Sequence, residues 1–283
     1  MSTDPDRFLP RPRVGLSEAV ADLLRIRILS GALADGDLLP KQDELVEEYG
    51  VSRPALREAL RILETEGLIQ VRRGNVGGAV VRIPQPEGAA YTLGLVLQAR
   101  RVPFSEVVMA LRHLEPVCAG LCAGRADRKK AVLPALRSSQ RALRLAIKHD
   151  DSVAVVAAAR EFHETLVDAC GSQTLIVVVG TLEALWTAQA HSSGASSAAA
   201  GHHHDPSLRT QMADAHETIF SRIEEGDVDG ASKAARLHLD TARLHSTPDR
   251  GDVAVEAAMV RDHYLRAGRE TDGALRSATD RRT

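Results

Sequence analysis

The sequence predicts a mainly α-helical protein with two domains. At 283 residues the chain is long enough for two cores, since a typical domain has about 150 residues. Apolar residues recur every three or four positions along most of the chain, which is the spacing of one face of a helix. Residues 68–83 differ, because β-branched residues lie on both sides of a glycine-rich turn and predict a short β-hairpin.

The composition excludes several classes of protein. Lys and Arg number 36 against 38 Asp and Glu, and the formal charge of -2 argues against coating nucleic acid or an anionic membrane by bulk charge. Aromatic residues, at 3%, are too sparse for a surface that stacks on single-stranded bases. Three cysteines are too few for a disulfide framework, and we find neither an apolar run of about 18 residues nor a signal peptide. We therefore expect a cytoplasmic protein that does not contact a membrane.

Residues 1–83 are predicted to form a small domain of three helices and the hairpin. The helices cover residues 16–30, 42–49 and about 53–66. Gly50 lies in the tight turn between the second and third helices. Ser52 is suited to cap the third helix, and Pro54 falls in its first turn, where no N–H is needed. Two short helices joined by a tight turn and followed by a hairpin describe a winged helix-turn-helix.

Arginines are concentrated on the third helix and the hairpin of this domain. Residues 51–83 carry six arginines and three acids, a local excess of +3. Because arginine binds phosphates and guanine edges, these residues predict a DNA-binding surface. Its candidate residues are Ser52, Arg53, Arg57, Arg61, Arg72, Arg73 and Gly74. Alternatively, Arg57 and Arg61 only form ion pairs on a solvated helix face, with Glu58 and Glu64 as the available acids.

The rest of the chain is predicted to be a linker, a helical domain and a tail. Residues 84–92 begin with PQPEG, whose prolines and glycine favour a linker. Apolar spacing then predicts an all-α helical bundle over residues 93–247. Its helices cover residues 104–125, 131–149, 150–169, 172–190, 207–225 and 228–245. The low-complexity stretch 192–206 is predicted to be a flexible loop, and the tail 248–283 to hold one more helix at 252–268.

Eleven histidines raise the question of a metal site. Three of them, at positions 202–204, lie in the low-complexity stretch, where we expect them to be solvated. His163, His216 and His238 each fall in a separate predicted helix. Local sequence alone does not select these three, since a lone histidine on a helix is usually structural, although imidazole is the commonest metal ligand.

A run of about forty residues in the first domain resembles the DNA-binding domain of the GntR superfamily of bacterial transcription regulators. The resemblance rests on Leu39-Pro40, Val51-Ser52-Arg53-Pro54, Leu56-Arg57-Glu58-Ala59-Leu60, Leu63-Glu64 and Glu66-Gly67-Leu68. It implies that Ser52, Arg53 and Arg57 contact double-stranded operator DNA. The wing glycine, Gly74, is implied to enter the minor groove with Arg73 beside it.

The helical region 93–245 resembles the FCD ligand-binding domain of the fatty-acid-regulator-like branch of that superfamily. The supporting features are Leu111-Arg112-x-x-Glu115, Glu161-Phe162-His163, the spacing of His216 and His238 around Gly226-Asp227, and the helix count. The resemblance implies a divalent metal, zinc or nickel, inside the bundle, where it binds an effector carboxylate. The implied ligands are His163, His216 and His238. Arg112 is implied to be a second anchor for the carboxylate, and the alternative is an ion pair of Arg112 with Glu115.

The sequence departs from each resemblance at one position. Ala159 lies one turn before His163, where the FCD domain has an aspartate ligand. Zinc can still use three imidazoles with water or an effector, although loss of an anionic ligand weakens the affinity. In the first domain, Asp43 stands where the short helix of the family often has an arginine that contacts a phosphate or a base.

These features predict a transcription regulator, a repressor modulated by a small carboxylate. Two-fold symmetric DNA requires two recognition helices, so we expect a homodimer. One alternative is a DNA-binding regulator whose helical domain only dimerises, or binds its effector without a metal. Another is a metallohydrolase that uses the three histidines. Since no general base is evident near them, and no Ser-His-Asp, Cys-His or phosphate-loop motif is present, we expect no enzyme activity.

Overall fold

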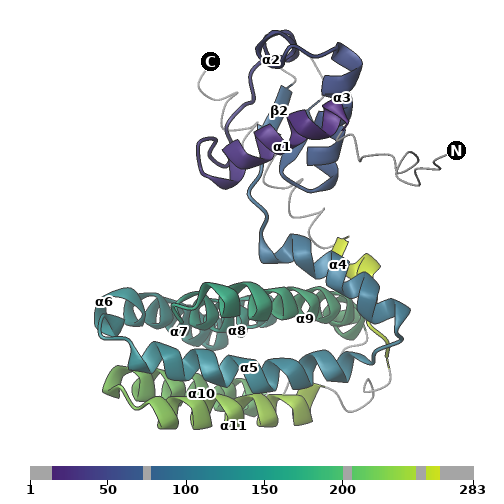
Figure 1. Ribbon diagram of the computed structural model, residues 1–283. Helices are drawn as coiled ribbons and strands as arrows, with labels where there is room; N and C mark the ends of the chain where they lie inside the picture. Colours follow the sequence, from purple (N-terminus) through teal and green to yellow (C-terminus); the bar gives the residue numbers. More distant parts are fainter. Residues whose placement is uncertain (1–14, 73–77, 200–205, 247–252, 262–283) are drawn as a thin grey trace, which may run out of the picture. The chain divides into compact units, whose positions relative to one another are not determined.

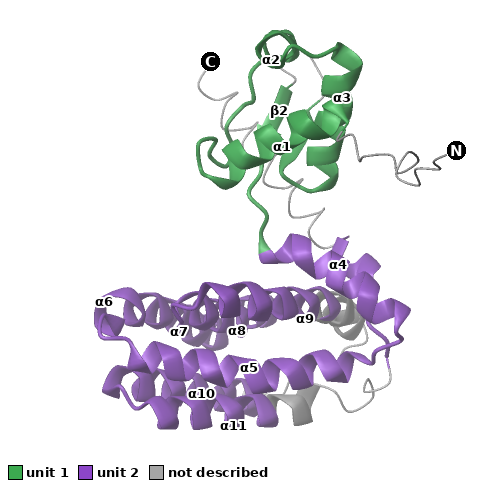
Figure 2. Ribbon diagram, in the orientation of Figure 1, with its two compact units in different colours: residues 1–85 green, residues 86–283 purple. Residues whose placement is uncertain are grey.

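The computed structural model describes residues 15–72, 78–199, 206–246 and 253–261. The chain divides into two compact units, Met1–Gln85 and Pro86–Thr283 (Figure 2). The first unit contains three helices and two strands among its described residues, and the second is helical.

The first unit is the winged helix-turn-helix that the sequence predicts. Its elements are α1 (Leu16–Leu29), α2 (Gln42–Tyr49), α3 (Arg53–Thr65), β1 (Ile69–Arg72) and β2 (Gly78–Val81). Helix α3 packs against α1 and α2, and its apolar face buries Leu56, Leu60 and Leu63 in their shared core. Burial of this face leaves the arginines of α3 on the opposite, exposed side.

The turn between α2 and α3 sets the start of the recognition helix. Gly50 has a φ of 62°, a left-handed conformation that glycine adopts without steric cost. The Ser52 hydroxyl accepts a hydrogen bond from the Ala55 N–H at 3.4 Å and so caps α3, as predicted. Pro54 lies in the first turn of the helix, where its missing N–H is not needed.

The wing is a two-stranded antiparallel hairpin. Ile69 pairs with Val81 and Arg72 with Gly78, and the turn between the strands lies in residues 73–77, outside the described residues. An isolated bridge from Leu38 to Val80 ties β2 to the segment before α2. Of the candidate residues on the wing, Arg72 is the one that the structure describes, and it lies at the exposed end of β1.

The second unit is a bundle built around α5 (Phe104–Gly124). Its other helices are α4 (Pro86–Ala99), α6 (Arg128–Ala131), α7 (Leu133–Lys148), α8 (Ser152–Asp168), α9 (Gln173–Ala199), α10 (Pro206–Glu225) and α11 (Val228–Ser246). Figure 1 shows α10 and α11 on one side of α5 and α7, α8 and α9 on the other. The core between these helices includes Leu136, Phe162 and Ile219.

A close approach of α5 and α11 holds one side of the bundle together. At Gly120 on α5, an added Cβ would collide with the Ser232 hydroxyl oxygen on α11 and would lie 3.4 Å from the Val228 carbonyl oxygen. A larger residue at this position would therefore force the Ser232 side chain to move. The close approach matters for function because α5 and α11 both contribute residues to the polar centre described below.

The predicted linker at 84–92 is mostly wrong, because α4 begins at Pro86. Proline is well suited to the first turn of a helix, so the residues interpreted as a break instead start one. Helix α4 packs on α9 and buries Ala90. Residues 82–85 are the only irregular segment between β2 and α4.

The predicted loop at 192–206 is wrong for its first part, since α9 continues to Ala199. This stretch is rich in alanine, the residue with the highest helix propensity, and low complexity therefore does not prevent a helix here. Residues 200–205, which include the three consecutive histidines, lie outside the described residues.

Part of the predicted tail belongs to the core of the second unit. Of residues 248–283, the structure describes 253–261, and these are helical from 257 to 261. Val255 and Val260 are buried in a cluster with Phe104 and Leu185. The domain therefore extends past its predicted end at residue 247.

One described helix, α5, is long and apolar enough to cross a membrane by length and composition alone. Half of its apolar window is buried inside the molecule, and the helix carries Glu106, Arg112 and Glu115. The core helix of a bundle passes the same test, and α5 is such a helix here.

Candidate metal centre and nucleic-acid surface

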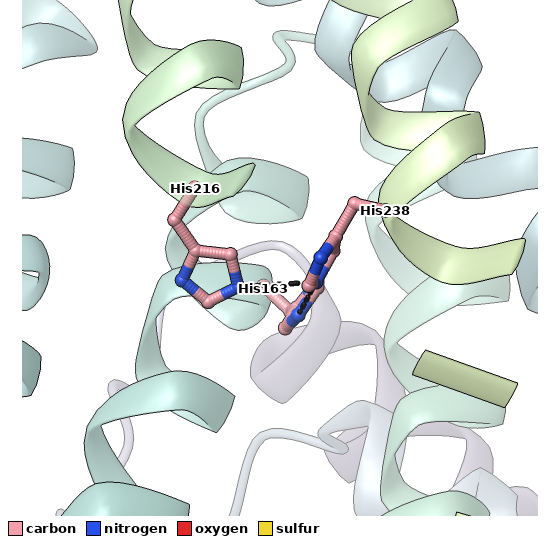
Figure 3. A group of neighbouring side chains, drawn as sticks. All are labelled: His163, His216 and His238. Carbon is pink, nitrogen blue, oxygen red and sulfur yellow. Dashed lines mark hydrogen bonds between the residues drawn. The ribbon is translucent and has the colours of Figure 1, made fainter. Parts of the chain in front are cut away.

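Three imidazoles from three helices meet inside the second unit (Figure 3). His163 lies on α8, His216 on α10 and His238 on α11, and all three are buried. The Nε2 atom of His238 is 3.1 Å from Nε2 of His216 and 3.3 Å from Nε2 of His163. Their neighbour Phe162 stacks on the His216 ring, with centroids 4.1 Å apart, and fixes its plane.

The spacing of these nitrogens fits a shared metal ion. Metal–nitrogen bonds of about 2.1 Å at tetrahedral or octahedral angles separate two ligand nitrogens by roughly 3.0–3.4 Å. The two Nε2 distances of 3.1 and 3.3 Å fall in this range. His163, His216 and His238 are also the only group of three potential ligands found among the described residues. The residues therefore fit a divalent metal that prefers nitrogen ligands, such as zinc or nickel.

Glu115 contacts the His163 ring on the Nδ1 side, away from the other two imidazoles. Its carboxylate, on α5, lies 2.6 Å from Nδ1 of His163, and the side chain of Glu115 is only 1% exposed. A carboxylate that accepts a hydrogen bond from Nδ1–H directs the Nε2 lone pair of the same ring toward a metal and makes it a stronger ligand. Glu115 is therefore a positioning residue for the candidate metal centre.

The same contact controls the charge of the centre. Burial lowers the pKa of His163, but the Glu115 carboxylate outweighs burial and raises that pKa to about 9. Burial and the charge of His163 lower the pKa of His238 to about 3, and they lower the pKa of His216 as well. At neutral pH the metal-free centre thus holds one imidazolium, His163, and two neutral imidazoles.

A second buried carboxyl group supports Glu115. Glu183 on α9 is 4% exposed and lies close enough to Glu115 for each carboxyl group to shift the pKa of the other. Burial and the charge of Glu115 raise the pKa of Glu183 to about 8, so that Glu183 is protonated at neutral pH. The sequence analysis missed Glu183 altogether, although it is the only charged residue between positions 173 and 190 and its apolar neighbours could have marked it as buried.

The structure contradicts one of the two interpretations of Arg112, and the other, an effector anchor, stays a prediction. Arg112 forms an ion pair with Asp240 on α11, and the expected alternative pair of Arg112 with Glu115 is wrong. The reason is the rotation of α5 about its axis, which points Glu115 into the bundle toward His163. Arg112 lies on a different, partly exposed side of the same helix. Ala159 is buried one turn before His163 on α8, so that no carboxylate enters the centre at that position.

The arginines of α3 differ in their acidic partners. Arg61 pairs with Glu58 at 2.7 Å, as the alternative of a solvated helix face predicts. Arg53 pairs with Asp43 on α2 at 3.0 Å. Arg57 is exposed and has no acidic partner among the described residues. Arg73 and Gly74 lie outside the described residues, and the assignment of all these residues to DNA contacts stays a prediction.

Comparison with known families identifies both units. Residues 16–80 match the bacterial regulatory proteins of the gntR family, and residues 106–241 match the FCD domain. The chain therefore combines a gntR-family domain with an FCD domain. GntR regulators of this kind are DNA-binding transcription factors with an FCD effector-binding domain, and the family is one of regulators rather than enzymes.

Individual relatives agree with this assignment. The Uxu operon regulator of Haemophilus influenzae is 29% identical over 231 residues, which are 80% of this chain and 79% of the relative. A putative L-lactate dehydrogenase operon regulatory protein of Escherichia coli is 29% identical over 245 residues, or 84% and 88% of the two chains. The solved structure of a Streptococcus agalactiae GntR protein has the same fold, with a TM-score of 0.60 and 23% identity over 81% of this chain and 99% of that chain.

The role of Glu115 leads to a testable prediction about metal uptake and pH. In the wild-type protein each bound zinc must displace the proton of His163, whose pKa is about 9, so zinc affinity should rise by about tenfold per pH unit between pH 7 and 8. Glu115→Gln should flatten this dependence, because the pKa of His163 then falls toward its ordinary value. At pH 8.5 the variant should bind zinc about tenfold more weakly than the wild type.

The measurement is a competition titration of metal-stripped protein against a chromophoric chelator. The matched control is Glu161→Gln, which removes one negative charge from the exposed side of α8, two residues before His163. The control should keep the wild-type pH dependence. Equal zinc affinities and equal pH slopes for Glu115→Gln and wild type would show that Glu115 does not position a metal ligand.

Proposed function

We propose that the protein is a repressor that binds operator DNA as a homodimer and responds to a small carboxylate through a metal held by His163, His216 and His238. The observation that carries this proposal is the convergence of three buried Nε2 atoms in the FCD domain of a chain that also has a winged helix-turn-helix. A regulator that works on chromosomal DNA acts in the cytoplasm.

The proposed DNA surface is the exposed face of α3 together with the wing. The N-terminal residues of a recognition helix reach base edges in the major groove, and here these positions are Arg53 and Arg57. Arg61, one turn further on, and Arg72 at the end of β1 are then within the reach of phosphates. We assign Arg73 and Gly74 to the tip of the wing by resemblance.

The proposed dimer uses an apolar face of α5. Val117 and Leu121 are 47% and 40% exposed, and Val228 on the neighbouring α11 is 45% exposed. These side chains line an open groove of about 700 Å³. Exposed apolar residues that gather in one place mark an interface, and a second copy of this chain would bring the second recognition helix that a two-fold operator requires.

The proposed effector site combines the histidine centre with Arg112. When bound, a metal would offer a Lewis-acid position to a carboxylate oxygen, and three neutral imidazoles would leave its full positive charge available. Because Ala159 supplies no anionic ligand, this charge favours an anionic effector. Arg112 could exchange the Asp240 carboxylate for the effector's. The L-lactate dehydrogenase operon named for one relative is consistent with a small hydroxycarboxylate.

An enzymatic role for the same centre is less well supported. A metallohydrolase needs a base beside the metal-bound water. Glu115 contacts Nδ1 of His163, whereas the nitrogens that would hold a metal are the Nε2 atoms on the other side of the rings. Glu183, whose pKa is raised to about 8, is protonated at neutral pH and is not a base.

The DNA assignment predicts that Arg57→Ala weakens operator binding. Loss of a bidentate arginine contact costs about 1–3 kcal/mol, or roughly 5- to 150-fold in affinity. The measurement is a gel shift with the duplex upstream of the protein's own gene. Arg141→Ala, which removes an exposed arginine from α7 in the second unit, should bind like the wild type. If Arg57→Ala binds as tightly as the control, α3 is not the recognition helix.

The dimer assignment predicts that Val117→Glu yields monomers. A charge buried in the proposed interface would have to lose its hydration without gaining a partner. Light scattering at micromolar concentration reports the mass. The control is Val153→Glu on α8, where the valine is 82% exposed and lies away from this groove, and this variant should remain dimeric. A dimeric Val117→Glu protein would place the interface elsewhere.

The effector assignment predicts a metal-dependent thermal shift. A ligand that binds only the folded protein raises its melting temperature. Metal-stripped protein should therefore be stabilised by a small carboxylate only after zinc or nickel is added, and His238→Gln should abolish this dependence. A carboxylate that stabilises the metal-stripped protein and the variant equally well would instead support an effector site without metal.

A further inference from the structure

Asp43 and Arg53 form the only described ion pair between the two helices of the helix-turn-helix. The Arg53 guanidinium lies 3.0 Å from the Asp43 carboxylate, and the two side chains are 71% and 74% exposed. A solvent-exposed pair of this kind contributes little to folding. Its position, at the start of α2 and of α3, is where the two helices of this motif face DNA.

We propose that Asp43 competes with DNA for Arg53 and so lowers the affinity of the protein for DNA. The inference rests on the proposed contact of α3 with DNA. Arg53 can reach a phosphate or a base edge only after it leaves Asp43. The freed carboxylate then faces a phosphate backbone of the same sign, because the first helix of the motif crosses that backbone.

The other acids of α2 do not share this arrangement. Glu44 accepts a hydrogen bond from the Lys41 N–H at the start of α2, and Glu48 pairs with Arg27 of α1. Both are therefore engaged within the fold. Glu47 is exposed and has no ion pair with α3 among the described residues. Asp43 is thus the acid of α2 that holds a candidate DNA-reading arginine.

The competition acts on any DNA that Arg53 contacts. Whether Arg53 binds a phosphate or a base edge, its pair with Asp43 must first be broken, and the free-energy cost of this step is the same. Asp43 should therefore lower the affinity for non-specific DNA and for the operator by similar factors.

The test compares Asp43→Asn with Glu47→Gln, since both remove one negative charge from α2. The probes are a random-sequence duplex and an operator selected from a random pool with the wild-type protein. We expect Asp43→Asn to bind the random duplex roughly five- to tenfold more tightly at about 0.1 M salt. Its plot of log affinity against log salt should be steeper by about 0.9 for each recognition helix. The operator affinity should rise by a similar factor, and Glu47→Gln should change neither value by more than about twofold.

A double-mutant cycle assigns the effect to the pair. In an Arg53→Ala background, Asp43→Asn should change affinity no more than Glu47→Gln does. Equal gains for the two charge-removing variants in the wild-type background would reduce the effect to bulk charge and overturn the inference. Weaker operator binding by Asp43→Asn would also overturn it, since Asp43 would then assist DNA binding. Failure of the proposed DNA contact is distinguishable, because Arg53→Ala and Arg57→Ala would then leave affinity for both probes unchanged.

Discussion

The hydrogen bond between Glu115 and His163 is the interaction on which the second domain depends. It brings a carboxylate from α5 against an imidazole from α8 in the bundle interior, where an unpaired charge would be costly. Because His163 contacts His238, and His238 contacts His216, the single pair fixes the relative positions of four helices. Polar groups here determine which residues of an otherwise apolar core face each other.

The first domain solves a different electrostatic problem. Its arginines must be available to DNA, yet free arginines would attract any polyanion. Two of the three on α3 are balanced by nearby acids, Arg61 by Glu58 and Arg53 by Asp43. Positive and negative charges therefore nearly balance on the exposed face of the recognition helix, as they do over the whole chain.

The sequence predicted best where structure is determined by neighbours in the chain. Gly50, Ser52 and Pro54 act within one turn, so the helix-turn-helix could be derived from them. Prediction failed at Pro86, because a proline in the first turn of a helix and a proline in a linker look alike in the sequence. Only the packing of α4 against α9 distinguishes the two. Glu115 and Glu183 could not be assigned for a related reason. Their role depends on contacts between helices that are distant in sequence.

The raised pKa of His163 has a consequence for the metal-free protein. At neutral pH a proton sits on the imidazole that a metal would use, and this proton binds to the neighbouring ring at 3.3 Å. This proton lets His163 interact with both His238 and Glu115, and the Glu115 carboxylate balances its positive charge. Exchange of this proton for a divalent ion adds one net charge rather than two. Loss of metal and a fall in pH would therefore move the centre toward the same protonated state.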